Sequence, residues 1–210
     1  GACLGIPALT AYEAIRWAQQ MGGDLTGQTL LVIGAANNVG AYVVQMAKRA
    51  GAQVIGTVGS QTKAEFAKSL GVDHVIDYKQ VDAAHAVKDL TNGRGVDVII
   101  DMDLSAMDDL VCGGALAAHG VVVCYGSNNM NEVKLTFKTW LYLSVTLKLF
   151  LVYDLTDQER TQALAGLSQL LSQGEWTHAV GERFTLSQVA QAHESVEKGL
   201  SLGNVVVTLD

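Results

Sequence analysis

Short apolar segments alternate with helical segments along the first two thirds of the chain, and this alternation restricts the folds that the chain can adopt. Apolar and β-branched runs between turns predict strands at 29–33, 53–58, 74–77, 96–101 and 121–125. Apolar residues at helical spacing predict helices at 39–50, 61–70, 83–91 and from about residue 106. Such a chain folds as an α/β protein with a Rossmann-type, doubly wound parallel sheet, whose ligands bind beyond the carboxyl ends of the strands.

The alternation changes after residue 144. A sixth strand is predicted at 145–152, followed by an amphipathic helix at 157–173 and a second helix at 187–197. The apolar, β-branched run at 203–209 predicts a last strand. From about Gly174 onward the chain therefore reads as a strand, a helix and a strand that belong to a different layer from the main sheet of about six strands.

A glycine-bounded turn, Gly34-Ala-Ala-Asn-Asn-Val-Gly40, lies between the first strand and its helix. Gly34 permits a sharp turn, Gly40 lets the helix approach the strand, and the helix N-terminus attracts a pyrophosphate. Asn37 replaces the middle glycine of the usual dinucleotide pattern. Asparagine tolerates left-handed backbone conformations, so we expect the turn to persist. The alternative is that the Asn37 side chain crowds the phosphate. The pattern alone also fits a plain turn without a ligand, whereas Ala41 and Tyr42 after Gly40 exclude a Walker-type phosphate loop.

The end of the second strand carries no acidic residue where an NAD-selective fold places one against the ribose. Ser60 and Lys63 follow instead, and Tyr78 ends the third strand. A hydroxyl and a cation suit the 2′-phosphate of NADP. The alternative is that Lys63 is a solvated helix residue and Tyr78 a rim aromatic.

Composition excludes some classes of function. The net charge of -7 argues against binding nucleic acid through phosphate neutralisation. The spacing of the five histidines and three cysteines predicts no metal site and no disulfide framework, and we expect mostly buried thiols in a reducing compartment. The apolar run 140–152 is shorter than a membrane helix and reads as core. No export signal is visible at the beginning of the sequence, so the expected location is the cytoplasm.

Several segments resemble one family in the order in which they occur. They are Gly1–Ala14, Gly51–Ser60, Leu70–Tyr78, Gly95–Asp101 and Gly203–Val207. Together they resemble the zinc-free quinone oxidoreductases of the ζ-crystallin type, and the related enoyl reductases, of the medium-chain dehydrogenase/reductase superfamily. The resemblance implies an NADPH-dependent oxidoreductase that transfers hydride to a quinone or an α,β-unsaturated carbonyl. The alternative function is a non-catalytic nucleotide-binding or redox-sensing module.

The resemblance also implies a division of the chain. In this family a GroES-like catalytic domain is built mostly from residues that precede the segment seen here. We therefore expect an NADP(H)-binding Rossmann domain at 1–155 and a segment at 156–210 that returns to a catalytic domain outside this sequence. By itself, such a chain is expected to bind NADPH but to turn over slowly, and the sixth strand is expected to pair across a homodimer.

The family's cofactor contacts carry over to particular positions of this chain, whereas its catalytic residues remain unassigned. Asn37 and Asn38 depart from a usual Gly-Gly, the segment 102–105 departs from a small Val-Gly segment, and Asn204 stands where lysine is common. The predicted contacts near the nicotinamide are Thr10, Tyr125, Gly126, Ser127, Leu151 and Val152. Those on the phosphates and the adenosine are Gly34, Ala36, Asn37, Asn38, Val39, Gly40, Gly59, Ser60, Lys63 and Tyr78.

Overall fold

A six-stranded parallel sheet forms the centre of the molecule. The computed structural model describes residues 3–199 and 201–209. Its main sheet has the strand order β3-β2-β1-β4-β5-β6, which is the order of a Rossmann-type fold, so the predicted fold class is confirmed. The strands are β1 (Thr29–Val32), β2 (Gln53–Val58), β3 (His74–Asp77), β4 (Val96–Asp101), β5 (Leu116–Cys124) and β6 (Thr146–Leu149).

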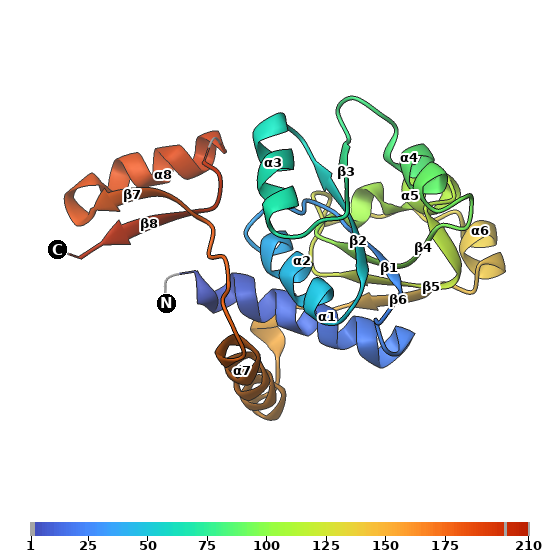
Figure 1. The fold of residues 1–210 in the computed structure, drawn as a ribbon, viewed down its shortest axis with the longest axis horizontal. Helices are drawn as coiled ribbons and strands as arrows, with labels where there is room; N and C mark the ends of the chain where they lie inside the picture. The colour runs from blue at the N-terminus through green and yellow to red at the C-terminus, as the bar shows by residue number, and fades with distance from the viewer. Residues whose placement is uncertain (1–2, 200, 210) are drawn as a thin grey trace.

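Helices cover both faces of this sheet (Figure 1). Successive strand residues point to opposite faces, so Leu30 and Val32 enter one apolar core while Leu31 enters the other. The first core is closed by α1 (Leu9–Gly22), α2 (Gly40–Arg49) and α3 (Gln61–Ser69), and the second by α4 (Ala83–Leu90), α5 (Met107–Cys112) and α6 (Phe137–Tyr142). The short helices η1 (Leu4–Ala8) and η2 (Leu104–Ala106) precede α1 and α5.

The last part of the chain forms a helix on the main body and then a smaller unit beside it (Figure 1). After η3 (Val152–Asp154) comes α7 (Asp157–Ser172), followed by the parallel pair β7 (Val180–Thr185) and β8 (Asn204–Thr208). Between these strands lie η4 (Leu186–Gln188) and α8 (Val189–Lys198). The predicted strand, helix and strand in a separate layer are therefore confirmed.

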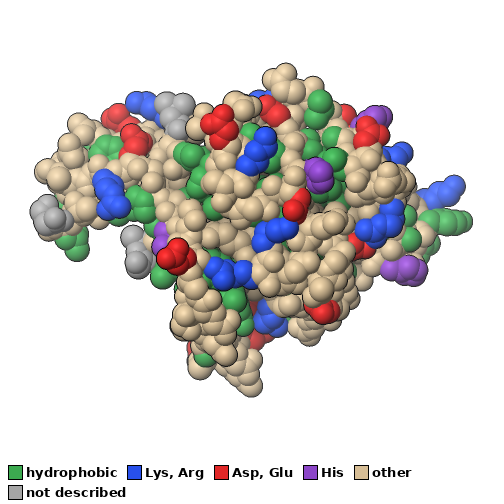
Figure 2. Space-filling model, viewed as in Figure 1, with side chains coloured by type: hydrophobic (Ala, Val, Ile, Leu, Met, Phe, Trp, Pro, Cys, Tyr) green, Lys and Arg blue, Asp and Glu red, His purple; other side chains and the backbone are tan. Residues whose placement is uncertain are grey.

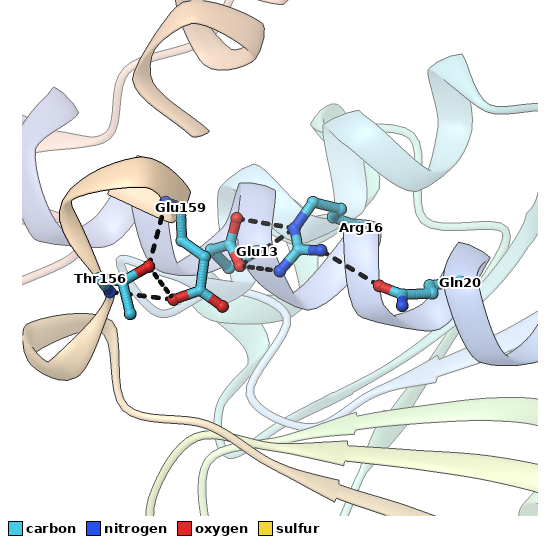
Figure 3. A network of polar contacts seen from close by, with 5 residues as sticks. All are labelled: Glu13, Arg16, Gln20, Thr156 and Glu159. Atoms are coloured by element: carbon cyan, nitrogen blue, oxygen red, sulfur yellow. Dashed lines mark hydrogen bonds and ion pairs between the residues drawn. The ribbon is translucent and has the colours of Figure 1, made fainter. Parts of the chain in front are cut away.

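The helix α7 packs on α1 through apolar side chains, and Figure 3 shows the polar contacts within each of the two segments. Ala163 and Leu167 are buried in the same core as α1. Thr156 caps α7 by accepting a hydrogen bond from the backbone N–H of Glu159, whose carboxylate accepts one from Thr156 in return. On α1 the buried Glu13 carboxylate accepts from Arg16 at 2.6 Å, so this buried charge is paired. The division at 155 stays a prediction.

Some elements differ from the sequence predictions. The helices α1 and α6 were not predicted, and β5 begins at Leu116 rather than at residue 121. The first residues of β5 pair with β4 before an irregularity in the register, where His119 has a φ of +62°. The predicted strand 145–152 is shorter because the backbone turns into η3 at Val152.

The apolar run 140–152 is only partly buried, so its prediction as core was partly wrong. Trp140 and Val152 are buried, but Leu149 and Leu151 are 54% and 55% exposed. The reason is that β6 is an edge strand, with β5 as its one neighbour in the main sheet.

Three surface features bear on the sequence predictions. Cys3 and Cys124 are buried as expected, but Cys112 is exposed at the end of α5. Within residues 3–199 and 201–209, no helix has the length and apolar character needed to cross a membrane. On the face drawn in Figure 2, basic and acidic side chains are interspersed rather than gathered by sign.

Candidate functional site

The carboxyl ends of the parallel strands meet at one edge of the main sheet, and most of the predicted site residues follow these ends. Gly34 comes after β1, Gly59 after β2, Tyr78 after β3, Tyr125 after β5, and Leu151 shortly after β6. Because ligands of open α/β sheets bind at this edge, the chain order itself brings these positions together.

The turn between β1 and α2 has the geometry expected of its two glycines. Gly34 has a φ of +71°, which side chains disfavour. A Cβ atom on Gly40 would lie 2.2 Å from the Gly34 carbonyl oxygen, so only glycine permits this approach of helix and strand. The turn forms as expected, but it does not use the tolerance of Asn37 for left-handed conformations, because Gly34 supplies the reversal and Asn37 does not have a positive φ.

The Asn37 side chain folds back into the turn instead. Its Oδ1 atom accepts a hydrogen bond from the Gly40 backbone N–H at 2.5 Å. Its Nδ2 atom donates to the Met102 Sδ atom, just beyond β4, at 2.9 Å. The amide also lies beside the Tyr125 hydroxyl, just beyond β5. One side chain thus joins three loops of the site.

A cavity of about 520 Å³ opens beyond the ends of the strands. This volume is within the range of small-molecule and cofactor sites. The loops after β1, β3, β4 and β5 contribute to it, together with one residue of β2. Its lining residues are Ile33, Gly34, Thr57, Tyr78, Asp82, Ala83, Ala84, Asp101, Met102, Asp103, Ala106, Asp109, Leu110 and Asn128. We call it the strand-end cavity.

Acidic side chains give the strand-end cavity a negative character. Four aspartates line it, and Asp101, the last residue of β4, is buried. Burial raises the Asp101 pKa to about 6, although its Oδ1 atom accepts a hydrogen bond from the Asp103 N–H at 2.9 Å. Burial would also raise the Asp103 pKa, but hydrogen bonds from Ser105 and Asn128 hold it below its usual value. A neutral or electron-poor ligand part fits this cavity better than a phosphate.

A second cavity, of about 220 Å³, lies between the turn and the C-terminal unit. Lys63 lines it together with Asn37 and Asn38. Of the described residues around the two cavities, Lys63 is the only lysine or arginine. The remaining lining residues are Ala36, Ser195, Val196, Gly199, Ser201, Gly203 and Val205. We call it the turn cavity, and its one cation favours an anionic group over a neutral one.

The three residues predicted to bind the adenosine phosphate together lie at different places along this edge. They are Ser60, Lys63 and Tyr78. The Ser60 Oγ atom caps α3 by accepting from the Lys63 backbone N–H at 3.4 Å. The Tyr78 hydroxyl covers Gly59, where a Cβ atom would lie 2.7 Å from it. Tyr78 lines the strand-end cavity, whereas Lys63 lines the turn cavity.

The residues predicted for the nicotinamide side lie near the ends of β5 and β6. The Tyr125 ring packs against Phe150, with ring centroids 6.2 Å apart. The Gly126 carbonyl accepts a hydrogen bond from the Leu104 N–H at 3.1 Å. Ser127 donates to the Asn129 carbonyl at 2.8 Å, and Val152 is buried beside the exposed Leu151. Thr10 is buried in the first turn of α1 and lines neither cavity.

Several residues of the two cavities were not predicted from the sequence as site residues. Asp101 and Met102 carried a signal, because Asp101 ends an apolar strand at the carboxyl edge of the sheet and Met102 follows it directly. Ser195 and Ser201 carried none, since only the packing of the C-terminal unit brings them to the turn. The described parts of the chain hold no group of three or more His, Cys, Asp or Glu that could bind a metal ion.

Comparison with known proteins gives the family. A family model described as zinc-binding dehydrogenase matches residues 38–169, which is more than half of the chain. The chain belongs to the zinc-binding dehydrogenase family. The match includes α2, most of the strands of the main sheet and most of α7, and it agrees with the resemblance to medium-chain dehydrogenases/reductases.

Two proteins with similar sequences are named as an oxidoreductase and a reductase. The chain is 32% identical over 202 residues to a quinone oxidoreductase of Rattus norvegicus, covering 93% of this chain and 58% of that protein. It is 30% identical over 189 residues to a 2-haloacrylate reductase of Burkholderia sp, covering 86% of this chain and 55% of that one. The chain thus spans less than two thirds of the length of these relatives.

A solved structure of the same fold contains a cofactor. The structure of a mycobacterial protein complexed with NADPH superposes on this chain with a TM-score of 0.80, and the two sequences are 27% identical. The superposition covers 95% of this chain and 62% of the mycobacterial one.

Proposed function

We propose that this chain forms the NADPH-binding part of an oxidoreductase that reduces a quinone or an α,β-unsaturated carbonyl. The observation that carries the proposal is the position of Lys63. It is the one cation of the two cavities within the described residues, and it lies beside the turn that precedes α2. A phosphate-bearing ligand is attracted to the turn cavity and repelled by the aspartates of the strand-end cavity.

The residues present fit a dinucleotide. Gly40 lets α2 approach the end of β1 closely, and the backbone N–H groups of Ala36, Asn38 and Val39 have no acceptor among the described residues. These donors and Lys63 would hold the phosphates. The strand-end cavity, with the Tyr78 ring at its rim, would take the adenosine.

Selectivity for NADPH over NADH is part of the proposal. No acidic residue follows β2 at Gly59 and Ser60, where an acid would accept hydrogen bonds from the ribose hydroxyls. The Ser60 hydroxyl and the Lys63 ammonium are suited to the additional phosphate of NADPH. The mycobacterial structure with NADPH supports this choice.

The reduced nicotinamide supplies the hydride when the cofactor is bound. Tyr125, Gly126 and Ser127 would form one wall of its site, and Leu151 and Val152 another. These residues position the ring and exclude water. The substrate class is supported by the names of the relatives, a quinone oxidoreductase and a 2-haloacrylate reductase, which both denote reduction.

A fluorescence titration with NADPH and with NADH tests the proposal. We expect tighter binding of NADPH, and we expect Lys63→Ala to weaken NADPH binding on the order of tenfold, as for the loss of one charged hydrogen bond. Lys68→Ala, in the last turn of the same helix, is the matched control and should leave the affinity unchanged. Equal effects of both substitutions, or binding of neither cofactor, would contradict the proposal.

A further inference from the structure

Asn37 occupies the space in which a dinucleotide fold usually receives the phosphates. Its Nδ2 atom lies 2.6 Å from the point where Gly34 would carry a Cβ atom. The space directly beside Gly34 in the turn is therefore taken by the chain's own amide. In the dinucleotide pattern this place is left open by a glycine so that the backbone can approach the pyrophosphate.

Asn37 also takes up a donor that a phosphate would use. The Gly40 N–H, in the first turn of α2, donates to Asn37 Oδ1 at 2.5 Å. At the other end of the amide, Met102 Sδ accepts from Nδ2 at 2.9 Å and the Tyr125 hydroxyl lies alongside. The side chain is thus held at both ends, by the α2 N-terminus and by the loops after β4 and β5.

We infer that Asn37 is an affinity-determining residue that competes with the cofactor diphosphate for the turn. This inference rests on the proposed function. In the free protein the Asn37 amide accepts the hydrogen bond of the Gly40 N–H and lies against Gly34. The amide must move away from both residues before a diphosphate can reach the N-terminus of α2. The donors of Ala36, Asn38 and Val39, together with Lys63, supply the attraction that displaces it.

The competition predicts an effect that depends on the diphosphate. Removing the side chain frees one backbone donor and the space over Gly34, so ligands with a diphosphate should gain affinity. Ligands without one should not, because the strand-end cavity does not include Asn37. ADP and adenosine differ in this group alone and are therefore the appropriate probes.

Calorimetric titrations of the native protein and of Asn37→Gly with ADP, adenosine and NADPH test the inference. We expect Asn37→Gly to bind ADP and NADPH about tenfold more tightly, with adenosine unchanged. The control is Asn92→Gly, the same substitution in the loop before β4, where the φ of +52° suits glycine. Met102→Leu keeps the side-chain volume but removes the acceptor, and it should give a smaller gain in the same direction.

The outcomes separate the two proposals. If the native protein binds ADP and neither Asn37→Gly nor Met102→Leu improves binding, the competition is wrong and the proposed function stands. Weaker binding by Asn37→Gly would also overturn it, because Asn37 would then be a phosphate ligand. Binding by Asn37→Gly alone supports the competition, and no binding by any variant contradicts both proposals.

Discussion

Asp101 shows how the position of one residue links the site to stability. The residue is 1% exposed at the end of β4, and burial raises the pKa of its carboxyl to about 6. An acid whose folded pKa is above its unfolded value destabilises the fold once it ionises. The cost is absent below about pH 4, grows between about pH 4 and 6, and is then on the order of 2–3 kcal/mol.

We therefore expect Asp101→Asn to raise the free energy of unfolding at pH 7.5 relative to the native protein and to have little such effect at pH 4. Asn retains an oxygen for the Asp103 N–H, so the hydrogen bond at 2.9 Å can persist. Urea unfolding at both pH values measures the difference. Asp103→Asn is the control. Because the Asp103 pKa is lowered in the fold, this substitution should lower the free energy of unfolding at pH 7.5. An increase in the free energy of unfolding by Asp101→Asn that is equal at both pH values would refute this account.

At the scale of elements, one face of α2 holds the segment that leads to the C-terminal unit. Gln45 donates to the Thr177 carbonyl at 3.1 Å and accepts from its N–H at 2.8 Å. One turn earlier the Tyr42 hydroxyl contacts His178 Nδ1 at 2.8 Å, and one turn later Arg49 lies over the Trp176 ring at 4.2 Å. Since α2 begins at the turn, this contact fixes the C-terminal unit relative to the turn cavity.

Gln45→Ala should loosen this segment without unfolding the sheet. Two hydrogen bonds are lost, so the free energy of unfolding should fall by about 1–2 kcal/mol. Hydrogen exchange of the Thr177 amide should accelerate, while exchange in the central strand β1 stays slow. Gln61→Ala, on the exposed start of α3, is the control. Unchanged protection at Thr177 would show that α2 does not hold the segment.

The elements differ in how far the sequence could predict them. The strands β1 to β4 follow from apolar runs between glycines, and the turn follows from Gly34 and Gly40, because these signals are local. The contact of α2 with residues 175–178 and the turn cavity could not be predicted, since they join residues more than 100 positions apart. Crowding of the phosphate by Asn37 was expected from its residue type, but its hydrogen bonds to Gly40 and Met102 could not be predicted, because the sequence does not show where the side chain turns.

At the scale of the whole molecule, the edge strand β6 leaves apolar surface uncovered. Leu149 and Leu151 are each more than half exposed, and Tyr142 and Tyr153 are exposed on either side of them along the chain. An edge strand with apolar neighbours is a template for pairing with another strand. We expect the chain to form a homodimer through β6.

Light scattering after size-exclusion chromatography measures this association. The native chain should have about twice the mass of 22.2 kDa, and Leu149→Lys should shift it toward the monomer. Leu164→Lys, on the exposed side of α7, is the control and should leave the dimer intact. A native monomer, or a dimer that Leu149→Lys does not affect, would rule out pairing through β6.

The central claim is that the carboxyl edge of the main sheet binds a nicotinamide dinucleotide, and an amide chemical-shift titration with NADPH tests it most directly. We predict that the perturbed amides cluster at Gly34–Gly40, Gly59–Ser60 and Tyr125–Ser127, while the amides of Gly93 and Gly114 at the opposite edge do not move. The absence of shifts at saturating NADPH, or shifts confined to the opposite edge, would contradict the claim.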